Sequence, residues 1–436
     1  MVKKKEAIAS PFVLEEEQPY PIPEKWIWTR LSNISHIRTG KKDANYGSIN
    51  GKYLFFTCAS EPIRCSDYSF DCKAILLAGN GNIGNISIYE GKFEVYQRTY
   101  VVEIIDPLLT EYCYYYFQYK WIDYNTDKMY GTAIPYIRLG NLQKFPIPLA
   151  PLPEQHRIVS CIESLFAKLD EAKEKVQTVL DGVELRKSAI LHKAFTGELT
   201  ERWRKEHGMG LDSWKHTKLI DVLKEKPRNG YSPKPVNYIT PYKSMTLSAT
   251  TSGVFKKEYF KYIDENIPED SYLWLQPGDI LIQRANSLDK VGTSAIYTGQ
   301  EYEFIYPDLM MKLQVIETVS PQFIAYCLKK SDVLAYFQAN ATGTAGNMPK
   351  INQKTVSNTP ISIPMLNEQI EIVRMLDNLL TQEQQTKEVA KNVLTQIDIM
   401  KKAILARAFR GELGTNDPKE KWAGELVKAY LPAQTG

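Results

Sequence analysis

The strongest constraint on the fold is an internal repeat whose two copies keep a constant separation along the chain. PIPLAPLPEQHRIV (146–159) corresponds to PISIPMLNEQIEIV (360–373), and Glu154 corresponds to Glu368, which is an offset of 214 residues. The same offset still holds at the AFTGEL and AFRGEL segments that end the two copies. Loops tolerate insertions, so a register kept over this length indicates that each copy forms a rigid element.

Each copy shows the apolar periodicity of a long helix. The spacing of apolar residues alternates between four and three, which is a heptad pattern. Prolines precede both predicted helices, and Gly197 and Gly411 follow them, as expected at helix ends. Glu383 and Thr386 interrupt the pattern in the second copy. The apolar positions are Ile158, Ile162, Leu165, Leu169, Ala172, Val176, Val179 and Val183 in the first copy, and Leu376, Leu379, Ala390, Val393, Ile397, Met400 and Ile404 in the second.

The length of these helices indicates how they pack. A helix of about 40 residues is about 60 Å long, which is more than one small domain can cover. We therefore expect the two helices to bury their apolar faces against each other as an antiparallel coiled-coil pair. Separate packing of each helix is the alternative.

The segments outside the repeat predict two similar domains of mixed α/β structure. Both are rich in aromatic and β-branched residues with turn signals between them. A late helix is expected in each domain, beginning near Thr110 in the first and after Ser320-Pro321 in the second. The predicted class is therefore α+β with pseudo-twofold symmetry. Its expected parts are a first domain at 1–145, a helical spacer at 146–199, a second domain at 200–358, a second spacer at 359–414 and a C-terminal tail at 415–436.

The sequence contains no motif of a known catalytic or cofactor site. The 5 histidines and 6 cysteines form neither a CxxC pair nor a zinc-binding spacing. Neither a GxxxxGK[ST] loop nor the NPP[YF] motif of amino-methyltransferases occurs. The GNGNIG segment (79–84) fits GxGxxG, but a strand-like sequence follows it where a dinucleotide site needs a helix, so we interpret it as a hairpin. We expect no catalytic residue, metal or cofactor in this chain.

The composition indicates a globular protein of the cytoplasm. Hydrophobic residues make up 43% of the chain, no apolar stretch is long enough to span a membrane, and no apolar segment follows the basic N-terminus. The formal net charge of +3 is mild. A nucleic-acid partner would therefore require the positive charge to be concentrated on one face.

Several loop residues are of the types that read base edges. In the major groove, Arg and Lys pair with guanine, and Asn and Gln pair with adenine. For each candidate, a solvated surface position or a structural hydrogen bond is the alternative. The aromatic run 112–121 is more simply explained as a buried helix face than as a base-stacking platform. The candidates are Arg38, Lys41, Lys42, Asn80, Asn82, Asn85, Gln97, Arg98 and Tyr100 in the first domain, and Lys243, Arg284, Asn286, Ser287 and Lys290 in the second.

The chain resembles the specificity subunits of type I restriction–modification systems. The residues that carry the resemblance are 146–159 and 194–199, their second copies, and the GTAIP segment (131–135) with its echo at Gly343-Thr344-Ala345 and Pro349. The resemblance implies two target recognition domains, each reading one half of a split site in double-stranded DNA, with the helices fixing the distance between the halves. It also implies that two modification subunits, which bind S-adenosylmethionine, and restriction subunits, which use ATP and Mg, are the partners. Catalysis would then belong to those partners, and no catalytic residue is carried over onto this sequence.

Two other functions remain as alternatives at the level of sequence. A coiled-coil scaffold with protein-binding ends would explain the helices but not two diverged domains with Arg and Asn loops. Salt-dependent DNA binding would distinguish it from a DNA reader, because phosphate contacts weaken steeply with salt. A single-chain nuclease or methyltransferase would need the motifs that are missing.

Overall fold

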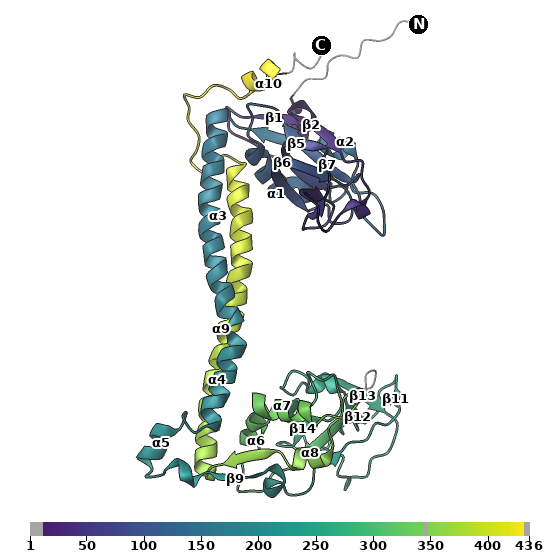
Figure 1. Cartoon of the computed structure of the whole chain (residues 1–436), viewed down its shortest axis with the longest axis vertical. Coiled ribbons are helices and arrows are strands. Elements are labelled where there is room, and N and C mark those ends of the chain that lie inside the picture. The colour runs from purple at the N-terminus through teal and green to yellow at the C-terminus, as the bar shows by residue number, and fades with distance from the viewer. Residues whose placement is uncertain (1–11, 344–347, 431–436) are drawn as a thin grey trace. The chain divides into compact units, whose positions relative to one another are not determined.

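The computed structural model describes residues 12–343 and 348–430, and the chain divides into two compact units (Figure 1). Unit 1 comprises Met1–Val176 and Asn392–Gly436, and unit 2 comprises Gln177–Lys391. Each unit holds one mixed α/β domain together with parts of the long helices. The predicted α+β class, with two domains and long helices, is confirmed.

The domain of unit 1 is built on a six-stranded sheet in the order β2-β7-β5-β6-β3-β4. Neighbouring strands are antiparallel except β3 and β6, which are parallel. Helix α1 (Thr110–Asn125) packs against the middle of this sheet, and α2 (Leu139–Gln143) follows it. A separate antiparallel pair joins β1 (Ile27–Arg30) to β8 (Pro146–Leu149). The strands of the large sheet are β2 (Ser35–Thr39), β3 (Tyr53–Phe56), β4 (Ile63–Cys65), β5 (Phe70–Ala78), β6 (Ile86–Val95) and β7 (Thr99–Ile104).

The domain of unit 2 keeps this outline but divides its strands between smaller sheets. One sheet has the order β10-β16-β14-β15 and another has the order β11-β13-β12. The antiparallel pair of β9 (Lys215–Lys218) and β17 (Pro360–Ile363) corresponds to β1 and β8. The remaining strands are β10 (Arg228–Asn229), β11 (Pro235–Val236), β12 (Tyr242–Met245), β13 (Phe260–Ile263), β14 (Ile280–Gln283), β15 (Ser294–Ile296) and β16 (Met310–Leu313).

The shorter helices follow the sequence signals at their ends. Helix α6 (Pro321–Cys327) begins with proline, and the Ser320 side chain accepts a hydrogen bond from Phe323 N, so the predicted cap is confirmed. The others are α5 (Glu201–Glu206), α7 (Ser331–Ala339), α8 (Gln353–Ser357) and α10 (Gly424–Tyr430). Short 3-10 helices lie at Glu15–Glu17, Leu31–Asn33, Ala44–Tyr46, Leu211–Ser213, Leu219–Val222 and Leu247–Ala249.

Strands β8 and β17 lie inside the segments that the sequence assigned to the helical spacers. Residues 146–149 and 360–363 pair instead with β1 and β9, as two separate two-stranded sheets. The repeated segment is therefore a strand followed by a helix. This explains why its register is kept so strictly, since both a sheet pairing and a helix face depend on it.

The first copy of the long helix is bent and the second is continuous. Helix α3 (Leu152–Asp181) ends one residue before α4 (Val183–Phe195), with Gly182 between them, whereas α9 (Leu366–Ala408) has no break. In unit 2, Glu184 pairs with Lys387 at 3.1 Å and Arg186 pairs with Glu383 at 3.0 Å. Residue numbers thus rise along one helix and fall along the other, which is antiparallel pairing.

The apolar stripe of the long helices departs from the heptad prediction at three positions. Val179, Val393 and Met400 are exposed, at 40%, 37% and 51%, so their assignment to the buried stripe is corrected. Their neighbours Leu180, Leu394 and Lys401 are half-buried instead. Buried stripe residues are Ile158, Ile162, Val183, Leu376, Ala390 and Ile397, and half-buried ones are Leu165, Leu169, Ala172, Val176, Leu379 and Ile404.

The break at Gly182 accounts for the change of register near Val179. The interruption at Glu383 is also explained, because this carboxylate is half-buried against Arg186. In unit 1, Lys401 pairs with Asp170 at 2.5 Å. Heptad positions are thus occupied by ion pairs as well as by apolar side chains.

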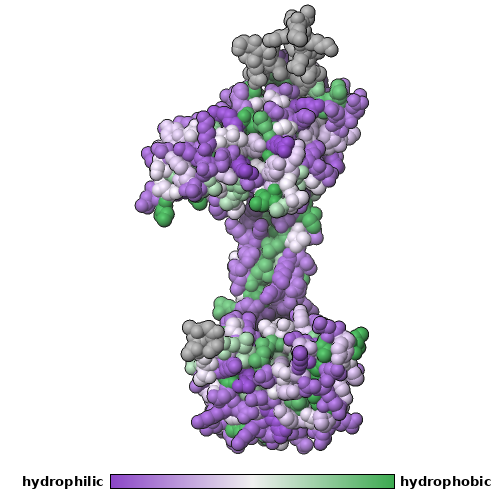
Figure 2. Space-filling view, turned by 90° about the vertical axis from the view of Figure 1, so that its right-hand side faces the viewer, coloured by the Kyte–Doolittle hydropathy of each residue, from purple (hydrophilic) through white to green (hydrophobic). Residues whose placement is uncertain are grey.

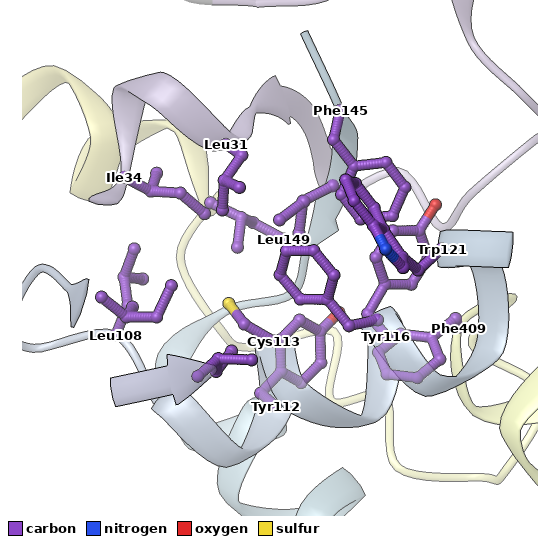
Figure 3. Packing of buried hydrophobic residues seen from close by; sticks show 14 of the residues in the cluster. Leu31, Ile34, Leu108, Tyr112, Cys113, Tyr116, Trp121, Phe145, Leu149 and Phe409 are labelled. Carbon is purple, nitrogen blue, oxygen red and sulfur yellow. The ribbon is translucent and has the colours of Figure 1, made fainter. Parts of the chain in front are cut away.

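The core of unit 1 forms around the aromatic run of α1 (Figure 3). Tyr112, Tyr116 and Trp121 are fully buried, so the prediction of a buried face is confirmed. The Tyr112 hydroxyl donates to the Pro148 carbonyl at 2.8 Å, and the Trp121 indole donates to the Ile83 carbonyl at 3.1 Å. These bonds satisfy the polar atoms of side chains that are otherwise surrounded by carbon.

The surface of the long helices is not uniformly polar. Figure 2 shows apolar side chains on the visible face of the helical segment. Val389, Ile399 and Met400 of α9 are each more than half exposed. Among the described residues, no helix combines the length and apolar character that crossing a membrane requires.

Candidate nucleic-acid interface

The glycine-rich segment after β5 is a hairpin loop, as predicted. It leads directly into β6, and Gly81 adopts a φ of 68°, which suits glycine. The side chains of Asn80 and Asn85 make structural hydrogen bonds to residues 58–59. The Asn80 side chain accepts a hydrogen bond from the Cys58 thiol at 2.9 Å, and the Asn85 side chain donates to the Ala59 carbonyl at 2.5 Å. Asn82 is exposed and is the member of the three that is presented to solvent.

The turn between β6 and β7 lies beside this loop. Gly79 N donates to the Arg98 carbonyl at 2.8 Å, which places the exposed Arg98 next to the asparagines. On the other side, Gln97 N donates to the Lys42 carbonyl at 2.9 Å. The structure therefore brings Lys42, Gln97, Arg98 and the hairpin loop together, although they are far apart in sequence.

Three candidates of the first domain are engaged elsewhere. Arg38 forms an ion pair with Glu103, and its guanidinium lies 5.1 Å from the Phe70 ring centroid, so its charge is already paired within the sheet. The Gln97 side chain donates to Asp43 at 2.8 Å. The Tyr100 ring is half-buried.

The two lysines after β2 remain near the surface. Lys41 is exposed, and the Lys42 ammonium lies 4.1 Å from the Tyr46 ring. The hydrogen bond to Tyr46 raises the pKa of Lys42.

A basic and aromatic stack at the same edge was missed at the sequence level. The Arg138 guanidinium lies 4.1 Å from the Tyr130 ring and donates to the Tyr136 hydroxyl at 3.3 Å. The Tyr130 and Tyr136 rings stack with centroids 5.5 Å apart. Arg138 and Tyr130 are exposed. The signal that could have found them is the GTAIP segment (131–135), which lies between the two tyrosines.

This stack is joined to the hairpin loop by a short bridge of backbone hydrogen bonds. Asn80 pairs with Tyr136 as an isolated β-bridge. Gly81 N donates to the Pro135 carbonyl at 2.8 Å, and Ile137 N donates to the Gly79 carbonyl at 2.9 Å. We call this arrangement, in which the loop after the central strand pairs with the segment ending at Ile137, the loop bridge.

Unit 2 builds the same loop bridge from a different central strand. Ala285 pairs with Lys350, Asn286 N donates to the Pro349 carbonyl at 3.3 Å, and Ile351 N donates to the Arg284 carbonyl at 2.8 Å. Pro349 and Ile351 stand 214 positions after Pro135 and Ile137, so the repeat register extends into both domains. Lys350 is exposed at the position equivalent to Tyr136.

The candidates of the second domain surround this bridge. Arg284 donates to the Asp308 carbonyl at 3.3 Å, and within the described part of the chain its buried Nε has no hydrogen-bond partner. Asn286 bonds to Gln283 at 2.6 Å, and Ser287 donates to Asp289 at 2.6 Å. Of these three side chains, Arg284 is the one with a buried donor that lacks a partner among the described residues.

Lys243 and Lys290 are less suited to read bases. The Lys243 ammonium lies 5.2 Å and 5.5 Å from the rings of Phe260 and Phe304, and Lys290 lies 3.6 Å from Asp289. Over residues 12–343 and 348–430, Arg98, Arg138, Arg284 and Lys350 make no ion pair with a carboxylate. The two bridges therefore gather cations that are not neutralised.

Chemical groups for metal binding do not gather at either bridge. Among the described residues, no group of three or more His, Cys, Asp and Glu side chains could hold a metal ion. The six cysteines are free thiols, and burial raises the pKa of Cys113 and Cys327 to about 12. The arrangement at the bridges can donate hydrogen bonds and present positive charge.

The sequence and the fold were compared with those of known proteins. Residues 23–180 and 212–396 match the family model of the type I restriction modification DNA specificity domain. Over 417 residues the chain is 27% identical to the EcoDI specificity subunit of Escherichia coli, which covers 90% of this chain and 89% of that protein. It is 26% identical over 288 residues to the EcoKI specificity subunit of Escherichia coli (strain K12), covering 65% of this chain and 61% of the relative.

Two solved structures share the fold. A chain from a structure that addresses complex assembly and conformational transition of the type I R-M system superposes with a TM-score of 0.70 at 19% identity, over 91% of this chain and 100% of that one. The crystal structure of the HsdS subunit from Thermoanaerobacter tengcongensis gives a TM-score of 0.57 at 20% identity, with the same coverage. At these identities the likeness establishes the fold.

Proposed function

The chain belongs to the family of type I restriction–modification DNA specificity subunits, and from this premise we propose that each of its two domains reads one half of a bipartite site in double-stranded DNA. The reading edge of each domain is the one that carries the loop bridge. The observation that carries the proposal is the recurrence of this bridge, with the same hydrogen bonds, in two domains whose sheets differ. Two readers of different half-sites need a shared frame and divergent side chains.

The side chains at the bridges have the chemistry that base reading requires. Arg98 and Arg138 in the first domain, and Arg284 and Lys350 in the second, offer donors to guanine or phosphate. The exposed Asn82 side chain has the donor and acceptor groups that pair with adenine. In a chain with a net charge of only +3, these cations without a carboxylate partner support DNA binding at the bridges.

We propose that the long helices set the spacing between the half-sites and dock two modification subunits. The exposed apolar residues Val389, Ile399 and Met400 support a docking role, because such side chains on a helix favour contact with a partner. As the family resemblance implies, methylation and cleavage are assigned to modification and restriction subunits. S-adenosylmethionine, ATP and Mg are assigned to those subunits as well.

The proposal is tested by removing the cations of one bridge at a time. Arg98→Ala with Arg138→Ala is expected to weaken binding to one half-site, by about 1–3 kcal/mol for each bidentate contact to guanine that is lost. Arg284→Ala with Lys350→Ala is expected to affect the other half-site. Methylome sequencing of cells carrying this chain and its modification subunits gives the site, and binding of the assembled complex is measured on duplexes with one half-site randomised.

Arg202→Ala is the matched control, because Arg202 is an exposed arginine of α5 that pairs with Glu206. Equal losses on unrelated sequences, with a shallower dependence on salt, would identify phosphate contacts in place of base contacts. Unchanged DNA binding by both double variants would contradict the proposal and favour a protein-binding scaffold.

A further inference from the structure

Helix α3 begins with a buried glutamate–glutamine pair that binds the domain of unit 1. The Glu154 carboxylate accepts hydrogen bonds from the Trp26 indole at 2.8 Å and from the Thr415 hydroxyl at 3.1 Å. The side-chain Oε1 of Gln155 accepts a hydrogen bond from Leu109 N at 3.3 Å. The side-chain Nε2 of Gln155 donates to the backbone carbonyl five residues upstream at 2.9 Å. Glu154 and Gln155 are 1% and 0% exposed.

Helix α9 begins with the same pair, which makes the corresponding hydrogen bonds in unit 2, where Glu368 also pairs with Arg204 at 2.7 Å. The Glu368 carboxylate accepts from the Trp214 indole at 3.0 Å and from the Thr200 hydroxyl at 2.7 Å. The side-chain Oε1 of Gln369 accepts a hydrogen bond from Ser320 N at 2.8 Å. The side-chain Nε2 of Gln369 again donates to the backbone carbonyl five residues upstream, at 2.8 Å. We call Glu154, Gln155, Glu368 and Gln369 the clamp residues.

The clamp residues tie each helix to two separate elements of its domain. Trp26 and Trp214 stand directly before β1 and β9, and Leu109 and Ser320 stand directly before α1 and α6. Two bonds in different directions restrict both the shift and the rotation of the domain against the helix end. The threonine in each clamp adds a third anchor, from the segment that leaves the antiparallel partner helix.

Stability alone does not require polar groups at these positions. Buried charges and amides lose solvation, and well-packed apolar side chains of similar size are often as stable or more stable. Burial accordingly raises the pKa of Glu154, while its hydrogen bonds act in the opposite direction. Directional hydrogen bonds have a different effect, since they select one geometry where apolar packing tolerates sliding.

We propose that the clamp residues are positioning residues for spacer length, which hold each reading domain in one orientation on its helix so that only one distance between the half-sites is accepted. This inference rests on the proposed function. The clamps act through the domains and touch neither bases nor phosphates. Their loss relaxes the accepted distance and leaves the base preference of each half-site intact.

The test uses Gln155→Met and Gln369→Met, which remove the amide with little change in side-chain volume. The full complex with its modification subunits methylates duplexes whose spacer is shortened or lengthened by one base pair. For each complex, the methylation rate on an altered spacer is divided by the rate on the native spacer. This ratio is expected to be about tenfold higher for the variants than for the wild type, because one or two directional hydrogen bonds no longer oppose movement of the domain on its helix. Preference for the bases within each half-site stays as in the wild type.

Leu169→Ala is the control, since it removes a half-buried apolar side chain from α3 without contacting a clamp residue. Trp26→Phe and Trp214→Phe provide a second pair of variants, which keep one aromatic ring and lose the indole donor together with the second ring. The inference is overturned if the two glutamine variants and the two tryptophan variants all keep the wild-type spacer preference. It is also overturned by an equal loss of methylation on every spacer, or by the same relaxation in Leu169→Ala. If the wild-type complex shows no base preference in either half-site, the proposed function itself fails.

Discussion

The two domains are held to the long helices by the same hydrogen bonds but by different apolar contacts. In unit 2, Phe195 packs against Phe323 with ring centroids 5.2 Å apart. Its repeat counterpart in unit 1, Phe409, packs against three tyrosines of α1 at 5.2, 5.0 and 6.2 Å: Tyr112, Tyr116 and Tyr119. The comparison teaches that directional contacts are kept with the repeat, whereas apolar contacts change with the domain.

A second difference lies where each helix passes along its domain. Phe166 fills this position in unit 1 and packs against Tyr115 with centroids 5.9 Å apart. The counterpart in unit 2 is Leu380, which lines a cleft of about 650 Å³ together with Leu334 and Lys329. Burial there lowers the pKa of Lys329. The domain of unit 2 is therefore held by less apolar packing than the domain of unit 1.

Among the described residues, unit 2 has a buried ion pair at the start of its long helix that unit 1 does not reproduce. Arg204 lies 2.7 Å from Glu368, and both side chains are almost fully buried. In unit 1, the exposed Arg157 binds the Thr415 carbonyl at 2.7 Å and acts on Glu154 through Thr415 and through its charge. Unit 2, whose domain has less apolar packing against its long helices, is thus the unit with the buried ion pair at that contact.

The largest effect is expected from breaking this ion pair. Arg204→Met should destabilise unit 2 by about 3–5 kcal/mol, because Glu368 is left buried without its cation. Unit 1 should be unaffected. Hydrogen exchange in α6 and in α1 measures the two units separately. Adding Glu368→Gln should recover part of the loss, and no recovery would show that Arg204 acts by packing alone.

A smaller difference should separate the two phenylalanines. Phe409→Ala is expected to cost about 4 kcal/mol in unit 1, and Phe195→Ala about 3 kcal/mol in unit 2, because Phe409 leaves a larger cavity among aromatic rings. Denaturant unfolding followed by exchange in each unit measures both values. Equal costs, or a larger cost for Phe195→Ala, would contradict the asymmetry of the joints.

The smallest effect should come from exchanging the side chains at the cleft. Leu380→Phe is expected to stabilise unit 2 by about 1 kcal/mol, because it adds apolar volume where the cleft lies. The reverse change in unit 1, Phe166→Leu, should cost about 1 kcal/mol. Thermal unfolding measures both. A Leu380→Phe variant that is less stable than the wild type would mean that the cleft cannot accept a ring.

Much of the fold could be predicted from local patterns. The α6 cap at Ser320, the buried face of α1 and the helices of the repeat depend on neighbouring residues, so periodicity and end signals suffice. The prediction of a buried apolar stripe is wrong at Val179 because the break at Gly182 shifts the buried face of the helix. A glycine within a heptad pattern does not by itself specify such a break.

The candidate site was predictable only in part. Arg98 and Arg284 are exposed or underused donors beside a loop bridge, as their residue types suggested. Arg38 is paired with Glu103 from another strand, and residue type carried no sign of this. Lys350 escaped notice because it pairs with Ala285, and Arg138 because it contacts Tyr136, which pairs with Asn80; both partners are distant in sequence.

The sequence by itself determined the repeat, its long helices and the two mixed domains that they accompany. These follow from periodicity and register, which are properties of residues close together in the chain or at a constant offset. The tertiary structure alone decided which cations are neutralised, which heptad positions are buried and where the clamp residues bind. Those outcomes depend on contacts between elements distant in sequence, and such contacts form only when the strands, loops and helices are folded together.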